Sequence, residues 1–113
     1  KLYIKEKNYH ISKINFQVYY DKNPIASITL PVNTPIGRKD FASLEKEYVS
    51  TISRVHFIIE RSPDGELSIS DLGSKNGTIV NELSIAPNYS WKLTNETKNI
   101  INIGKLQLET TND

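Results

Sequence analysis

Three short segments of this sequence carry residues that can bind an oxyanion. They are Gly37-Arg38, Ser53-Arg54-Val55-His56 and Gly73-Ser74-Lys75-Asn76-Gly77-Thr78. The planar guanidinium of Arg38 matches two oxygens of a phosphate, and Ser53 offers a hydroxyl and a backbone N–H to the same group. Arg54 adds a second positive charge beside Ser53. If the fold brings the three segments together, their donors suit a phosphate.

The last of these segments has two interpretations. Asn76-Gly77 favours a tight turn with a positive φ angle, so the segment can be a simple hairpin connection. Alternatively, the amide of Asn76, with one acceptor and two donors, pairs with the main chain of an extended peptide. A nucleotide-binding phosphate loop is excluded, because no Lys-Ser/Thr pair follows the last glycine and a strand pattern follows instead of a helix.

Neither catalysis nor metal binding is indicated around His56. His10 is the other histidine and the chain has no cysteine, so a metal site lacks partners. A triad of Ser53, His56 and Asp71 lacks the nucleophile-elbow pattern. We therefore expect no catalytic residue, no metal and no cofactor, and we interpret His56 as hydrogen-bonded to nearby loop backbone.

Composition limits the class of protein. The chain has 113 residues, of which 37% are hydrophobic and 24% charged, as expected of one globular domain. A formal net charge of +1 does not predict a nucleic-acid surface, and no apolar run reaches the ~20 residues of a membrane span. We expect a cytoplasmic domain that contacts neither nucleic acid nor membrane. Because the sequence contains no methionine, even at position 1, we expect it to be a piece of a longer protein.

Alternating apolar and polar residues predict the strands that position the three segments. Residues 16–20 and 26–30 alternate in this way around a turn at 21–24, which predicts a hairpin. We expect Val55, Phe57 and Ile59 to share the inward face of a later strand.

That alternation would direct His56 to the opposite face of its strand. Ser62-Pro63-Asp64-Gly65 predicts a turn into a return strand that contains Leu67 and Ile69. Residues 39–51 show no clean period and are predicted to form a long loop with a short strand. After Thr78, short apolar pieces recur between turn residues, which predicts an all-β sandwich or barrel.

The order and spacing of the three segments resemble those of the forkhead-associated (FHA) domain, over about Phe16 to Thr110. This resemblance implies an all-β fold, a β-sandwich of two sheets with about eleven short strands, and binding of phosphothreonine peptides. It divides the chain into an N-terminal extension or linker (1–15), the domain (16–110) and a polar tail (111–113).

The resemblance also implies a role for individual residues. Arg38 and Ser53 would bind the phosphate, Arg54 and Lys75 would add donors or charge near it, and Asn76 would fix the ligand backbone. The residues expected to support the shape of the site are Gly37, His56, Gly77 and Thr78.

Some positions depart from the family pattern. Glu82 stands where a glycine is common, residues 94–98 lack the usual Gly-Asp turn, and the 39–51 loop lacks the common acidic pattern. The first two departures do not touch the expected phosphate residues, and the third leaves the selectivity around the phosphate open.

The expected partners are phosphothreonine-containing protein segments in a Ser/Thr kinase pathway. The alternative is a phospho-independent docking or structural β-sandwich. Affinity for phosphorylated and unphosphorylated forms of one peptide would distinguish the two.

Overall fold

The first hairpin forms where the alternating pattern predicts it. In the computed structural model, which describes residues 10–94 and 97–111, β1 (Lys13–Tyr20) pairs antiparallel with β2 (Asn23–Pro31). Asp21 and Lys22 form the turn with φ angles of 48° and 67°, the left-handed values that a tight hairpin turn requires. β1 begins at Lys13 and so extends beyond Phe16, where the sequence pattern became clear.

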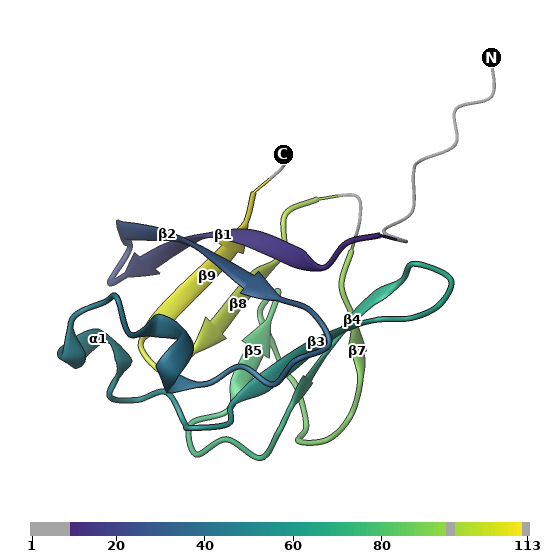
Figure 1. Cartoon of the computed structure of the whole chain (residues 1–113). Coiled ribbons are helices and arrows are strands. Elements are labelled where there is room, and N and C mark those ends of the chain that lie inside the picture. Colours follow the sequence, from purple (N-terminus) through teal and green to yellow (C-terminus); the bar gives the residue numbers. More distant parts are fainter. Residues whose placement is uncertain (1–9, 95–96, 112–113) are drawn as a thin grey trace.

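Two antiparallel sheets make up the fold (Figure 1). The six-stranded sheet has the order β2-β1-β9-β8-β5-β6, and the three-stranded sheet has the order β3-β4-β7. Their remaining strands are β3 (Phe57–Arg61), β4 (Leu67–Asp71), β5 (Thr78–Val80), β6 (Leu83–Ser84), β7 (Trp91–Lys92), β8 (Ile100–Ile103) and β9 (Leu106–Thr110). The β-sandwich is confirmed, with nine strands in the described residues and two isolated bridges, Ile36–Phe57 and Asp71–Pro87.

The second predicted hairpin is confirmed, but its first strand is shorter than expected. β3 and β4 pair around the turn at 62–66, where Gly65 has a φ of 84°. Val55 lies before β3 and is 52% exposed, whereas His56 is fully buried, so the expected inward and outward positions of these two residues were wrong. The chain bends at residues 54 and 55, and the alternation of the strand does not extend back into this segment.

The segment 39–51 contains two short helices instead of the predicted strand. η1 (Arg38–Phe41) is a 3₁₀ helix and α1 (Lys46–Val49) is a single α-helical turn. Phe41 and Val49 are buried and anchor the segment, while the ring of Tyr48 packs 4.6 Å from that of Tyr20 at the end of β1. One buried apolar residue in each short helix holds this segment against the core.

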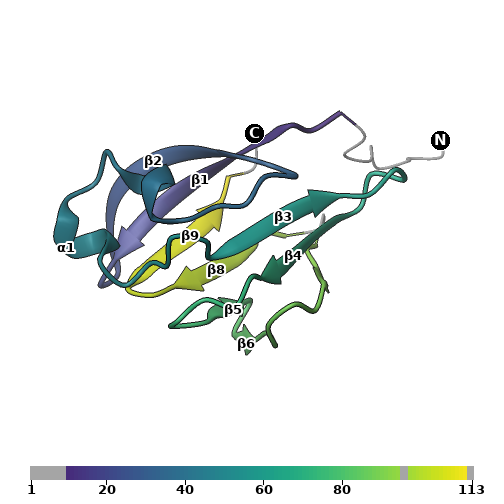
Figure 2. The same ribbon diagram turned by 60° about the horizontal axis from the view of Figure 1, so that its bottom comes forward.

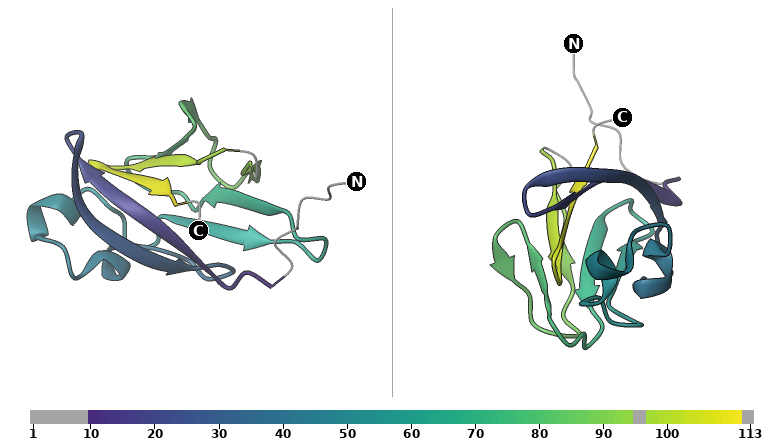
Figure 3. Two further views of the ribbon diagram at one scale, coloured as in Figure 1. Left: turned by 90° about the horizontal axis from the view of Figure 1, so that it is seen from above. Right: turned by 90° about the vertical axis from the view of Figure 1, so that its left-hand side faces the viewer.

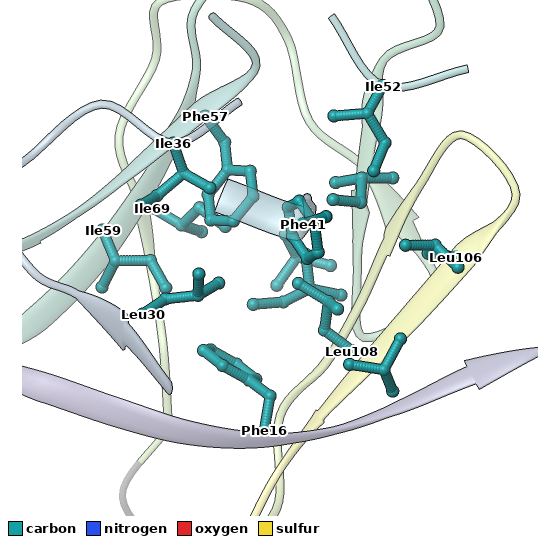
Figure 4. Close-up of a cluster of buried hydrophobic side chains, with 14 of the residues drawn as sticks. Phe16, Leu30, Ile36, Phe41, Ile52, Phe57, Ile59, Ile69, Leu106 and Leu108 are labelled. Carbon is teal, nitrogen blue, oxygen red and sulfur yellow. The ribbon is translucent and has the colours of Figure 1, made fainter. Parts of the chain in front are cut away.

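The core lies between the two sheets and reaches under the helical segment. Fully buried side chains come from both sheets and from the connecting loops, as Figure 4 shows for Phe16, Phe57, Ile69 and Leu108 together with Phe41. One rigid apolar centre therefore supports both the strands and the loops that leave them.

The three polar segments lie at one end of the sandwich because of the directions in which the strands run. β3 begins and β4 ends at this end, and the turn between β8 and β9 lies there as well (Figures 1 and 2). The views in Figure 3 show η1 and α1 at the same end, away from the β3–β4 turn. No helix in the described ranges is long and apolar enough to cross a membrane.

Candidate functional site

Gly37 and Arg38 run beside residues 53–57. The N–H of His56 donates to the carbonyl of Ile36 over 2.8 Å, and the N–H of Arg38 donates to the carbonyl of Ser53 over 3.0 Å. Gly37 is buried here, and a Cβ on it would overlap the carbonyl oxygen of Arg54. Only glycine allows the two segments to approach this closely.

Arg38 is exposed but held in place through one end of its guanidinium. Its Nε donates to the carbonyl of Ile52 over 2.9 Å. Its two terminal nitrogens have no protein partner among residues 10–94 and 97–111. A guanidinium fixed at Nε presents both remaining nitrogens to solvent, the edge that binds two oxyanion oxygens.

His56 joins two of the loops from below. Its Nδ1 accepts the N–H of Ser53 over 3.1 Å, so the ring hydrogen lies on Nε2, which donates to the carbonyl of Gly77 over 2.8 Å. These contacts agree with the interpretation of a histidine bonded to loop backbone. Because both ring nitrogens bond the main chain, His56 does not form a triad with Ser53 and Asp71.

Asp71 organises the third loop. Its carboxylate accepts four hydrogen bonds, from the hydroxyls of Ser74 and Thr78 (2.6 Å each) and from the N–H groups of Gly73 (2.9 Å) and Ser74 (3.0 Å). The Ser74 hydroxyl in turn accepts the N–H of Gly77 over 2.9 Å, and Gly77 has a φ of 81°. Burial raises the pKa of Asp71, but the hydrogen bonds from Ser74, Thr78 and Gly73 outweigh it, and the pKa is lower than usual.

This loop connects β4 in one sheet to β5 in the other. The simpler interpretation of Asn76-Gly77 as a hairpin connection was therefore wrong. The crossing places Lys75 and Asn76 next to residues 51–53, because both segments lie where β3 begins and β4 ends.

Two hydrogen bonds fasten this loop to the preceding one. The N–H of Lys75 donates to the hydroxyl oxygen of Ser53 over 2.9 Å, and the amide of Asn76 donates to the carbonyl of Thr51 over 2.8 Å. The hydroxyl oxygen of Thr51 also accepts the N–H of Lys105 over 2.9 Å. The Ser53 hydroxyl keeps its own hydrogen for a ligand, and the Asn76 amide keeps one hydrogen and its oxygen.

The structure thus brings all five expected binding residues to one rim. The rim is defined by Arg38, Ser53, Arg54, Lys75 and Asn76. The side chains of Arg54 and Lys75 are exposed and, like the terminal nitrogens of Arg38, have no ion-pair partner in the described part of the chain. Cations without carboxylate partners leave the rim positively charged.

Sequence reasoning missed two residues that hold the rim together. Asp71 was considered only as a triad member, although its spacing to Gly73 and Ser74 is typical of an Asx turn. Thr51 had no signal in the sequence, because it contributes a backbone carbonyl to Asn76 and a hydroxyl to the β8–β9 turn.

Together, the fold and the rim define an all-β sandwich domain with donor-rich loops gathered at one end. The family model of the FHA domain matches residues 34–104, more than half of the chain. The chain therefore belongs to the FHA domain family. A search of the curated proteins finds no match to it.

Solved structures share this fold. The FHA domain of the CT664 protein from Chlamydia trachomatis is 24% identical, with a TM-score of 0.61 over 90% of this chain and 99% of that one. The N-terminal FHA domain of S. cerevisiae Rad53p, solved with a phosphothreonine peptide, is 19% identical, with a TM-score of 0.58 over 86% and 90% of the two chains. A third structure, from work on phosphothreonine-dependent FHA domain interactions, is 24% identical, with a TM-score of 0.57 over 88% and 97%. At these identities the likeness shows the fold.

Proposed function

We propose that this domain binds phosphothreonine-containing segments of partner proteins. One observation supports this most. The backbone N–H of Arg38 donates to the carbonyl of Ser53 over 3.0 Å and its Nε donates to that of Ile52 over 2.9 Å, while its two terminal nitrogens have no partner among the described residues. Family membership and the ligands named for related structures support the same ligand class.

Each rim residue has a role in this proposal. The terminal nitrogens of Arg38 bind two phosphate oxygens, and the free hydrogen of the Ser53 hydroxyl donates to the phosphate. Arg54 and Lys75 add positive charge. Asn76 uses its second amide hydrogen and its oxygen to pair with the ligand main chain. Gly37, His56, Gly77 and Thr78 hold the loops in place.

The hydrogen bonds between these residues and the phosphate are strong enough for reversible binding. A phosphothreonine brings about −1.5 to −2 charges and three strong acceptor oxygens. Hydrogen bonds that involve charged groups contribute roughly 1.5–3 kcal/mol each. Contacts from Arg38, Ser53 and Arg54 thus supply most of the ~8 kcal/mol that micromolar affinity represents. Such binding depends strongly on the phosphate and suits a regulatory adaptor.

We also propose the pathway, the cellular location and the boundaries of the domain. A phosphothreonine ligand implies that the domain acts downstream of a Ser/Thr kinase, and we propose that it does so in the cytoplasm as a non-catalytic module. The module extends from the first residue of β1, Lys13, and not from 16 as the resemblance implied, to 110, and the residues before it and 111–113 are flanking segments. Its ligands are proteins, and neither nucleic acid nor membrane takes part.

Calorimetric titration of one peptide in two forms tests the function. We expect micromolar affinity for the phosphothreonine form and at least about 100-fold weaker binding of the unphosphorylated form, since most of the contacts are to phosphate. A phosphoserine form shows whether the threonine methyl matters. Equal affinity for phosphorylated and unphosphorylated peptides would instead support phospho-independent docking.

A further inference from the structure

The pair Asn76-Gly77 in the rim combines two residue types that react with each other. No other asparagine of the chain is followed by glycine, and all the others precede larger residues. The backbone nitrogen that follows an asparagine attacks the carbon of its side-chain amide, and a side chain on the following residue hinders this attack. Gly77 has no Cβ to hinder it. Asn76 is exposed, so water reaches the pair.

The reaction is a deamidation that consumes only water. The nitrogen of Gly77 gives up its hydrogen to solvent and bonds to Cγ of Asn76, and the amide nitrogen leaves as ammonia. Water then opens the resulting five-membered imide at one of its two carbonyl carbons. The product is aspartate or isoaspartate in place of Asn76, with one negative charge added at neutral pH. No electron is transferred, so no oxidant or reductant takes part.

In the folded protein, hydrogen bonds hold both reacting groups. The N–H of Gly77 donates to the hydroxyl oxygen of Ser74 over 2.9 Å. The amide nitrogen of Asn76 donates to the carbonyl of Thr51 over 2.8 Å. The attack breaks the first of these bonds and rotates the amide out of the second. It therefore requires a local opening of the 71–78 loop.

We propose that Asn76 is a deamidation site whose conversion ends ligand binding, and that the Ser74 hydroxyl sets the rate by holding the N–H of Gly77. The effect on binding rests on the proposed function, whereas the covalent chemistry and its control by Ser74 do not. The hydrogen bonds of one loop then determine how long the domain stays able to bind its ligand.

Conversion changes the rim in its bonds and in its charge. A carboxylate at position 76 has no hydrogen to donate to the carbonyl of Thr51, so two oxygens face each other where a hydrogen bond joined the loops. The new charge lies in the same rim as Arg38, Arg54 and Lys75 and lowers their attraction for a phosphate. Isoaspartate also lengthens the main chain by one carbon before Gly77. Each change weakens binding of a phosphorylated ligand.

Deamidation rates test the chemistry without any ligand. The wild-type domain is incubated at mildly alkaline pH, once folded and once in urea, and mass spectrometry of a digest follows the replacement of the amide by a carboxyl group. Asn88, which is exposed and followed by Tyr89, is the internal reference. In urea we expect Asn76 to convert faster than Asn88. In the folded protein we expect Asn76 to convert at least about tenfold more slowly than in urea.

Three variants test the role of the Ser74 hydroxyl. Ser74→Ala removes the acceptor of the Gly77 N–H and should accelerate conversion in the folded protein about tenfold. Ser74→Thr keeps a hydroxyl and should convert at the wild-type rate. Thr78→Val is the matched control, because it also removes a hydroxyl bonded to Asp71 but leaves the Gly77 N–H bonded to Ser74, so it should accelerate conversion less than Ser74→Ala. Thermal unfolding checks that each variant is folded.

Binding by the converted protein tests the consequence. Ion exchange separates this protein, because conversion lowers the formal net charge of +1 by one. We expect it to bind a phosphothreonine peptide at least about tenfold more weakly than fresh protein does. Unchanged affinity would overturn the loss of binding.

The remaining outcomes separate this inference from the proposed function. Equal rates for Asn76 in the folded and the unfolded chain, or equal acceleration by Ser74→Ala and Thr78→Val, overturn the control by Ser74. Fresh protein that binds no phosphopeptide overturns the proposed function and the effect on binding, while the rates still decide the chemistry. Slow conversion in the folded protein, its acceleration in Ser74→Ala and weaker binding afterwards together support the proposal.

Discussion

Two parts of the rim use their polar residues in opposite ways. In the 71–78 loop, the Asp71 carboxylate is 1% exposed and accepts four hydrogen bonds from its own loop. In the 38–54 segment, Arg38 and Arg54 are exposed, and the terminal nitrogens of Arg38 have no partner in the described ranges. The first arrangement uses polar groups to hold a shape, and the second keeps them available.

The 71–78 loop therefore contributes to folding stability, and the exposed arginines are available for ligand binding. A buried, bonded carboxylate leaves unpaired donors when it is removed, which costs folding free energy. Removing an exposed cation changes the folding free energy of the free protein little, since surface charges contribute little to stability. Substitutions in the two regions should therefore differ in which property they change.

Arg38→Ala should have the largest effect on binding. Loss of two charge-assisted hydrogen bonds to phosphate costs about 4 kcal/mol, so affinity for a phosphothreonine peptide falls about 1,000-fold. The free energy of unfolding should change by less than about 1 kcal/mol, because only the bond to Ile52 is lost. Calorimetric titration and urea unfolding measure both quantities.

Arg38→Lys is the matched control for this prediction. It keeps the charge and loses the planar fork, so its affinity should fall between those of the wild type and the alanine variant. Unchanged affinity of Arg38→Ala would remove this residue from the site and break the contrast between the two regions.

Asp71→Asn should show the converse behaviour. The amide nitrogen cannot accept hydrogen bonds, so two of the four donors lose their partner and unfolding becomes easier by about 3 kcal/mol. Urea unfolding measures the loss, with Glu60→Gln on the exposed side of β3 as the control. Wild-type stability in Asp71→Asn would show that the loop does not depend on this carboxylate.

The pH dependence of the free energy of unfolding is a second test of whether the Asp71 carboxylate stabilises the fold. Its pKa is lower in the folded protein than its usual value, so its contribution is complete above the unfolded pKa of about 3.9 and is lost as the pH falls through the folded pKa. The stability difference between wild type and Asp71→Asn should therefore be constant from pH 7 to 5 and shrink below pH ~4. A difference that keeps its full size at pH 2 would contradict this account.

Acid should weaken ligand binding before it affects this loop. The phosphate of phosphothreonine gains a proton near pH 6, so affinity should fall about tenfold between pH 7 and 5. Fluorescence anisotropy with a labelled peptide measures the change, and circular dichroism at each pH monitors the fold. A flat profile would argue against charge-assisted recognition.

Glu82→Gly should give the smallest effect, outside both regions. Asn81 and Glu82 form the turn between β5 and β6 with φ angles of 49° and 73°, and glycine adopts the second of these without strain. We expect stabilisation of about 1 kcal/mol in thermal unfolding and unchanged affinity for the phosphopeptide. Destabilisation would mean that the Glu82 side chain contributes more than its backbone strain costs.

Residues 39–56 show where prediction from sequence failed. The strand pattern suggested that Val55 points inward, yet the bridge between Ile36 and Phe57 marks the start of pairing, and the bend before it buries His56 instead. The two short helices were missed because Phe41 and Val49 are anchored by the core. A few apolar residues do not predict such contacts on their own.

The sequence alone predicted the two hairpins and an all-β sandwich or barrel, because alternation and turn chemistry are local properties of the chain, and its resemblance to the FHA domain supplied the two-sheet sandwich and the five rim residues. Only the tertiary structure decided how the rim is held together, through the bonds from Lys75 to Ser53, from Asn76 to Thr51 and from His56 to Gly77. These bonds join residues far apart in the chain. Their geometry depends on the packing of two sheets, which no local pattern records.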